Sequence, residues 1–332
     1  MEKNLVIEAY KLSKQFKSFE SKTGEKGLLT SLRRRYVYKK AVYDVTFTMK
    51  KGEFVALLGK NGAGKSTLVK LLVGIIKADS GEARLFGIDP YSERVKLAMN
   101  IGVVLGAHEQ MWEDLAAIDT FKLMEGVYGI PKTAFDKRLS YFIKVFNLEK
   151  VYRKQVRQMS LGERMKCNFI ASMLHMPKLV IMDEPTIGMD SQSKSSLFKA
   201  LQEIRKRYDI TFLLATNMVE EAEELADRIL LMDEGTLVYD GLPRELIKLV
   251  GGKKEVEIRL RKGARNMNLG RFGRIIAHKG DYIKLEMDGR RIKGKKLLDL
   301  LTSDNVLDYS ISEPPLDEVL NKFYSLSRKR LG

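Results

Sequence analysis

The chain has 332 residues, enough for two domains, and carries 59 lysines and arginines against 43 aspartates and glutamates, a net charge of +16. Its single cysteine excludes an intramolecular disulfide and any multi-cysteine metal site, and three scattered histidines argue against a histidine metal cluster. The positive excess suits an anionic surface, nucleic acid or the cytoplasmic face of a bilayer, and suits a plain solubilising surface equally well.

No stretch of the sequence predicts a membrane span or a secretion signal. The longest apolar runs, such as residues 179–182, are far shorter than the ~20 residues that a transmembrane helix needs. Residues 1–10 lack the apolar core of a signal peptide. The sequence therefore predicts a soluble, cytoplasmic protein.

Two strands and a basic segment are predicted before residue 50. Residues 5–16 are typical of a strand, and the polar stretch 17–31 is typical of a loop. The basic stretch 28–40 has one apolar side and suits a short helix on a membrane or transporter, or a solvated face. Residues 41–48 alternate between apolar and polar, which predicts a second strand.

A glycine-rich loop follows the next predicted strand. Residues 54–58 are a short apolar run typical of a buried strand, and residues 59–66 match the motif G-x-x-x-x-G-K-[ST] in full. Backbone N–H groups of such a loop, and of the helix that follows it, hold polyphosphates. The predicted nucleotide-binding residues of this loop are Gly59, Asn61, Gly62, Gly64, Lys65, Ser66 and Thr67.

The residue types in this loop have separate tasks. Its glycines let the backbone approach the phosphates without a Cβ in the way. Lys65 would neutralise the β- and γ-phosphates, and the Ser66 hydroxyl would ligate Mg²⁺. The sequence therefore predicts that the chain binds a nucleoside triphosphate.

After a short strand at residues 84–87, the strand signals mostly disappear. Apolar residues then fall on one helical face, at Phe135, Leu139, Phe142, Ile143 and Phe146. This pattern predicts a helical insertion at about residues 90–172.

An acidic pair ends the next apolar strand, at residues 179–182. Asp183 can hold Mg²⁺ through water, and the neighbouring Glu184 can orient or deprotonate an attacking water. Acidic pairs after strands also occur as helix caps, but here the pair lies in a chain that already carries the phosphate-binding loop.

The elements that follow complete an α/β pattern. Asp190 can cap a helix, residues 211–215 predict a buried strand, residues 220–226 a helix, and residues 229–239 a hairpin. Gly251 and Gly252 mark the domain boundary, so we predict domains at 1–250 and 253–332. The second has short alternating strands and helical pieces, a small α+β domain suited to regulation or docking.

The motif between the phosphate-binding loop and the acidic pair is the most specific feature of the chain. Residues 159–163 resemble the L-S-G-G-Q signature of ATP-binding subunits of ABC transporters, and the order of motifs from residue 5 to about 250 resembles that family too. The resemblance implies a P-loop ATPase fold, an ABC cassette with an antiparallel β subdomain. It also implies that two cassettes dimerise head to tail around ATP.

The resemblance assigns further residues. The signature set that would contact ATP in trans is Ser160, Leu161, Gly162 and Glu163. Asp190 resembles the dimer-interface residue of the D-loop. Phe16 resembles the aromatic that stacks on adenine, with Tyr36 and Tyr38 as rivals because the insertion at 17–40 blurs the comparison.

Finer features resemble one branch of the family. Residues 158–167, residues 184–188 and the insertion before the second strand are similar to the daunorubicin-resistance, ABC-2-type export ATPases. The tail near 311–319 is similar to their short C-terminal domain. This implies an exporter subunit, peripheral on the inner face of the membrane, whose helical insertion docks onto separate transmembrane permease subunits.

Two motif positions differ from the family pattern. The family has a Q-loop glutamine directly after the apolar residues that match 101–105, and here Gln110 is the nearest glutamine, a metal ligand only if the loop is longer. Asn217 stands where the family has its switch histidine, and its amide can donate a hydrogen bond but carries no charge. ATP binding is therefore better supported than fast hydrolysis.

The predicted function is that of an ATP-binding and ATP-hydrolysing exporter subunit, with ATP and Mg²⁺ as cofactors. One alternative is a slow or degenerate subunit paired with an active cassette. The other is a soluble ABC ATPase acting on nucleic acid, which the net charge favours. However, such proteins usually carry two cassettes, a coiled coil or zinc-binding cysteines. This chain has one cassette, no room for a coiled coil and one cysteine, so no nucleic-acid partner is expected.

Overall fold

The chain forms two compact units. The computed structural model describes residues 4–19, 36–106, 111–249, 253–261, 269–288, 301–312, 319–320 and 323. Unit 1 comprises residues 1–240 and unit 2 residues 241–332, so the division falls somewhat before the predicted boundary after residue 250. Within the described residues, no helix is both long and apolar enough to cross a bilayer.

A six-stranded sheet forms the centre of unit 1. Its strands lie in the order β5 (Ile101–Leu105), β6 (Leu179–Asp183), β7 (Thr211–Thr216), β3 (Phe54–Gly59), β8 (Arg228–Asp233) and β9 (Thr236–Gly241). The pairs β5–β6, β6–β7, β7–β3 and β3–β8 are parallel. The predicted strands at 54–58, 179–182 and 211–215 are confirmed, because strands covered on both faces are apolar throughout.

A three-stranded antiparallel sheet forms the second layer of unit 1. Its order is β2 (Tyr36–Lys50), β1 (Leu5–Phe19) and β4 (Ser80–Leu85), which confirms the predicted antiparallel subdomain. The structure differs from the predicted helix at 28–40, because residues 36–40 belong to β2 and pair with the end of β1. Residues 28–35 of that prediction lie outside the described residues.

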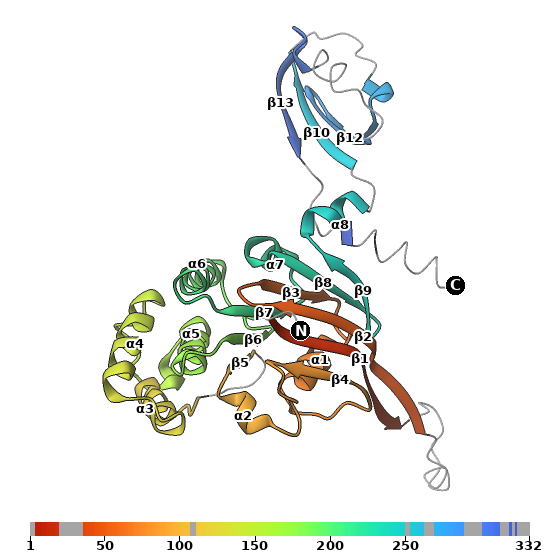
Figure 1. Ribbon diagram of the computed structural model, residues 1–332. Helices are drawn as coiled ribbons and strands as arrows, with labels where there is room; N and C mark the ends of the chain where they lie inside the picture. The colour runs from red at the N-terminus through yellow and green to blue at the C-terminus, as the bar shows by residue number, and fades with distance from the viewer. Residues whose placement is uncertain are drawn as a thin grey trace, which may run out of the picture. The chain divides into compact units, whose positions relative to one another are not determined.

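Eight α-helices and two 3₁₀ turns are described. They are α1 (Lys65–Leu72), α2 (Arg94–Ala98), α3 (Ala117–Val127), α4 (Lys132–Val145), η2 (Val156–Gln158), α5 (Leu161–Met173), α6 (Ser191–Tyr208), α7 (Val219–Leu225), α8 (Pro243–Leu249) and η3 (Leu269–Arg271). Helices α3, α4 and α5 gather together at one end of unit 1 (Figure 1). The helical insertion begins later than predicted, because residues 101–105 form β5 of the central sheet.

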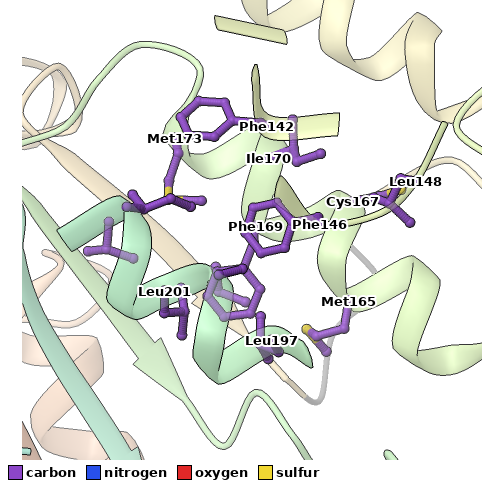
Figure 2. Packing of buried hydrophobic residues seen from close by; sticks show 14 of the residues in the cluster. Phe142, Phe146, Leu148, Met165, Cys167, Phe169, Ile170, Met173, Leu197 and Leu201 are labelled. Carbon is purple, nitrogen blue, oxygen red and sulfur yellow. The ribbon is translucent and has the colours of Figure 1, made fainter. Parts of the chain in front are cut away.

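The helical insertion is held to the rest of unit 1 by buried aromatic and sulfur-containing side chains. Phe142 of α4 and Phe146, which caps the end of α4, pack in one cluster with Phe169 of α5 and with Leu197 and Leu201 of α6 (Figure 2). Each fully buried side chain of this size contributes about 1.5–3 kcal/mol relative to leaving it exposed. Helices α4 and α5 are thus packed against α6, which belongs to the rest of unit 1.

Unit 2 contains a four-stranded antiparallel sheet. Its order is β11 (Arg274–Lys279), β12 (Tyr282–Asp288), β10 (Lys253–Leu260) and β13 (Val306–Ser312). Val256, Ile258 and Leu285 form part of its own buried cluster. The helical pieces predicted at 295–301 and 316–324 lie mostly outside the described residues.

Candidate active site

The register of the central sheet brings three sequence motifs to one edge. Leu58 of β3 pairs with Thr216 of β7, and Asp183 of β6 pairs with Ala215 of β7. The carboxyl ends of parallel strands therefore meet there, where α/β sheets bind their ligands. The glycine loop follows β3, the acidic pair ends β6, and Asn217 follows β7, so this edge holds the predicted nucleotide residues.

The turn into α1 depends on glycine at residue 64. Gly64 is the N-cap of α1, with φ at +103°, a backbone conformation that other residues rarely adopt. A Cβ at this position would lie 2.2 Å from the carbonyl oxygen of Ala41 in β2. The backbone of the loop at Gly64 thus lies directly against β2 of the second layer and close to Met232 of β8.

Lys65 lies inside this loop and is almost fully buried. Its Nζ donates to the carbonyl oxygens of Gly59 at 2.8 Å and Lys60 at 3.2 Å, and lies 3.5 Å from Glu184 Oε1. Burial lowers the pKa of Lys65, while the carboxylates of Glu184 and Asp183 oppose that shift. The ammonium is thus placed at the centre of the loop among oxygen acceptors.

Ser66 and Asp183 form a small oxygen-ligand pair beside Lys65. Ser66 Oγ donates to Asp183 Oδ1 at 3.1 Å. Burial raises the pKa of Asp183, and the hydrogen bond from Ser66 opposes that shift. A hydroxyl and a carboxylate are the hard ligands that Mg²⁺ accepts next to phosphate oxygens, so this donor set fits the metal.

Glu184 adopts an unusual backbone conformation directly after β6. Its φ is +49°, and its N–H donates to the carbonyl oxygen of Ala215 at 2.8 Å. Such positive φ angles in residues other than glycine cluster at functional sites. The conformation keeps the Glu184 side chain partly exposed, at 24%, and near Lys65.

Asn217 reaches the phosphate-binding loop directly. Its Nδ2 donates to Asn61 Oδ1 at 3.0 Å across 156 residues of sequence. The structure therefore brings six predicted residues together, namely Asn61, Lys65, Ser66, Asp183, Glu184 and Asn217.

The signature residues form a second group, at the start of α5. Ser160 Oγ accepts the N–H of Glu163 at 3.2 Å, and Glu163 Oε2 accepts the N–H of Ser160 at 2.8 Å, a capping box. A Cβ at Gly162 would lie 2.7 Å from Ser193 Oγ of α6, so close packing requires glycine there. Ser160 is exposed, and its hydroxyl still has a proton to donate.

Asp190 begins α6 beside this second group. Its carboxylate accepts the N–H of Ser193 at 2.9 Å and the Ser193 hydroxyl at 2.7 Å, which confirms the predicted helix cap. These bonds hold the pKa of Asp190 below its usual value. Ser193 thus joins the Asp190 cap to Gly162 of the signature.

The comparisons with known proteins agree with this geometry. A model of the ABC transporter family matches residues 42–187. The daunorubicin resistance ATP-binding protein DrrA3 of Streptomyces coeruleorubidus is 31% identical over 229 residues, covering 69% of this chain and 72% of that protein. The chain belongs to the ABC transporter family.

Two further similarities cover much of the cassette. The linearmycin resistance ATP-binding protein LnrL of Bacillus subtilis is 27% identical, covering 87% of this chain and 95% of that protein. The solved structure of cbiO1 from Clostridium perfringens, part of the ABC transporter complex cbiONQ, superposes with a TM-score of 0.61 at 25% identity. The superposition covers 75% of this chain and 95% of the cbiO1 chain. These similarities confirm the predicted family, fold and ATPase activity.

The adenine-stacking aromatic stays a prediction, but strand register favours one candidate. Phe16 pairs with Lys39, two residues before Ala41, whose carbonyl faces the loop at Gly64. At ~3.3 Å per residue, Tyr38 and Tyr36 lie about 10 Å and about 16 Å before Ala41 along β2, and Lys39 lies about 7 Å before it. Of the three aromatics Phe16, Tyr36 and Tyr38, all of them exposed, Phe16 is thus the nearest in register to the cassette's phosphate loop.

Two predicted sites and one missed residue complete the comparison. Gln110, the tentative metal ligand, lies outside the described residues. Thr67 is the third residue of α1, directly after Ser66 in the sequence. Sequence reasoning missed Glu221 of α7, a buried acid four residues after Asn217 that bonds to Thr186 and Thr216.

Proposed function

We propose that this cassette is the ATP-hydrolysing subunit of an ABC-2-type exporter and that its site uses the six residues around Lys65. The observation that carries the site assignment is the meeting of Lys65, Ser66, Asp183 and Glu184 at one edge of the parallel sheet. Release of phosphate from ATP by the purified chain, with Mg²⁺ and with EDTA, tests the assignment. Failure of the chain to bind ATP would refute it.

Each residue near the sheet edge has a task that matches its surroundings. Lys65 supplies a cation to the β- and γ-phosphates, and the N–H groups of the loop and of α1 supply neutral donors. Ser66 and Asp183 would hold Mg²⁺, which would supply positive charge to balance the charge that develops on the phosphates. Glu184 accepts a proton from the attacking water, because its carboxylate is partly exposed beside Lys65.

Dimerisation would complete the site. Ser160, Leu161, Gly162 and Glu163 of a second cassette would approach the γ-phosphate, with the exposed Ser160 hydroxyl and α5 N–H groups as donors. The Asp190–Ser193–Gly162 packing fixes the signature against α6 within each chain. ATP would close the pair and hydrolysis would reopen it, because ATP binds the closed form more tightly than ADP does.

The relatives support the export branch of the family. DrrA3 and LnrL are named as resistance ATP-binding proteins, which supports export of a small molecule as the function here. The partners would be transmembrane permease subunits and a second cassette, at the inner face of the membrane. The nucleic-acid alternative has no relative among these proteins to support it.

The bond from Asn217 to Asn61 supports a slow rather than an inactive site. Compared with the family's histidine, a neutral amide forgoes a charge-assisted bond of about 1.5–3 kcal/mol. If all of that is lost from the transition state, the rate falls roughly 10- to 150-fold. We therefore expect Asn217→His to raise the hydrolysis rate with little change in ATP affinity.

Steady-state ATPase assays across pH on both forms decide this prediction. The restored rate should fall in acid if the imidazole must be neutral, or in alkali if it must be charged. If the wild type hydrolyses ATP rapidly and Asn217→His slows it, the prediction of a slow site is wrong and asparagine is the better residue at this position.

Removing residues 253–332 should spare nucleotide binding. All six residues of the proposed site lie in unit 1, and the sheet of unit 2 has a buried cluster of its own. Titration of fluorescent ATP into the full and shortened chains measures this. If the shortened chain keeps its thermal unfolding transition but loses ATP affinity, residues 253–332 contribute to ATP binding and the prediction is wrong.

A further inference from the structure

A buried carboxylate lies directly behind the proposed hydrolysis site. Glu221, the third residue of α7, is 1% exposed. Its Oε2 accepts the Thr216 hydroxyl at 2.7 Å, and its Oε1 accepts the Thr186 hydroxyl. Lys194 Nζ of α6 lies 3.7 Å from Oε1. A buried carboxylate is tolerated only with such partners, because it has lost its hydration.

The two threonines belong to the two segments on which hydrolysis depends. Thr186 lies two residues after Glu184, and Thr216 directly precedes Asn217. Both threonine side chains are buried, at 2% and 1% exposed. A carboxylate only accepts hydrogen bonds, so both hydroxyls must donate to Glu221.

The Thr216 hydroxyl also shapes the turn that carries Asn217. It accepts the N–H of Met218 at 3.0 Å, so its single proton and one lone pair are both used. Lys194 Nζ contacts Met218 Sδ at 3.0 Å, and Lys194 lies in the first turn of the helix that Asp190 caps. One carboxylate thus ties the segment after β6, the turn after β7 and the start of α6.

We propose that Glu221 is a positioning residue for ATP hydrolysis, one that sets the separation between Glu184 and Asn217 through its bonds to Thr186 and Thr216. The inference rests on the proposed function of the site. A residue needed only for the core could be apolar, since well-packed apolar groups replace buried ion pairs without loss of stability. Here instead the two carboxylate oxygens go to different segments, and each segment carries one of the residues that face the γ-phosphate.

The test compares Glu221→Gln with Glu220→Gln, its exposed neighbour on the same helix turn. Glutamine keeps the shape but replaces one acceptor oxygen by an N–H donor, so one of the two threonine hydroxyls loses the acceptor for its proton. Small displacements of catalytic groups cost up to roughly 100-fold in rate, so we expect kcat of Glu221→Gln to fall roughly 10- to 100-fold. ATP affinity, from fluorescent-nucleotide titration, should stay unchanged, and Glu220→Gln should match the wild type in both.

Variants of the threonines separate positioning from plain stability. Thr216→Val and Thr186→Val remove a hydroxyl at equal size and should lower kcat, whereas Thr216→Ser and Thr186→Ser keep the hydroxyl and should restore it. Combining Glu221→Gln with Thr186→Val should lower kcat by less than the product of the single effects, because both variants disturb the bonds of the same carboxylate. These variants decide the case if Glu221→Gln does not fold.

The outcomes that overturn the inference differ from those that overturn the proposed function. If the wild type hydrolyses ATP and Glu221→Gln keeps its kcat, the positioning role is wrong and the site assignment stands. If the losses of kcat follow losses of thermal stability across the valine and serine variants, Glu221 is merely structural. If the wild type does not bind ATP at all, both proposals fail.

Discussion

Lys65→Ala is expected to weaken ATP binding more than any other single change. The Lys65 ammonium is held in the loop by Gly59 and Lys60 carbonyls and faces the acidic pair. Bonds to charged groups contribute about 1.5–3 kcal/mol each, and contacts to both β- and γ-phosphates would make two. The expected loss is therefore roughly 10²- to 10⁴-fold in Kd. Fluorescent-nucleotide titration measures it.

Lys77→Ala is the matched control for this prediction. It removes the same charge from an exposed position soon after α1, where the Lys77 ammonium lies over the Tyr91 ring. The control should bind ATP as the wild type does. Equal affinity of Lys65→Ala and wild type, with both folded by thermal unfolding, would contradict the assignment of the phosphate-binding loop.

Glu184→Gln is expected to stop hydrolysis while leaving ATP binding intact. The substitution removes only the proton acceptor, and general-base catalysis typically contributes 10²- to 10⁴-fold, so kcat should fall by about that factor. Single-turnover assays with labelled ATP resolve the residual rate.

Glu223→Gln, an exposed acid on α7, serves as the control for Glu184→Gln. Its rate should be that of the wild type. Wild-type turnover by Glu184→Gln would mean that another group accepts the proton of the attacking water.

The buried strands of the central sheet were predictable because nothing polar interrupts them. Strands β3, β6 and β7 are covered on both faces, so the residues between Phe54 and Leu58, for example, form one apolar run. The motif residues that come directly after these strands must lie near one another, because parallel strands end at the same edge of the sheet. This is why Ser66 and Asp183, from two distant motifs, meet at one edge of the sheet.

The parts that the sequence did not predict depend on contacts between distant segments. Lys39 and Lys40 are exposed and suited a basic helix, yet their backbones pair with the end of β1. The apolar residues 101–105 are too few to show either a helical or a strand periodicity, and they form β5 because they pair with β6. Local patterns carry no information on such pairings.

Glu221 shows the same limit within the site. Helical periodicity places Glu221 and Glu223 at the two borders of the apolar stripe formed by Val219, Ala222 and Leu225. Nothing local decides which acid is buried. Only the threonine hydroxyls of two other segments, which meet Glu221 in the fold, make it the buried one.

The most direct test of ATP-driven closure is the mass of Glu184→Gln in sedimentation equilibrium with saturating ATP and Mg²⁺. Because this variant should bind ATP without consuming it, the predicted result is twice the mass of one chain with ATP and a single chain with ADP. Adding Ser160→Arg, which fills the exposed signature position, should return the ATP sample to a single chain. A single chain with bound ATP and intact Ser160 would contradict the account.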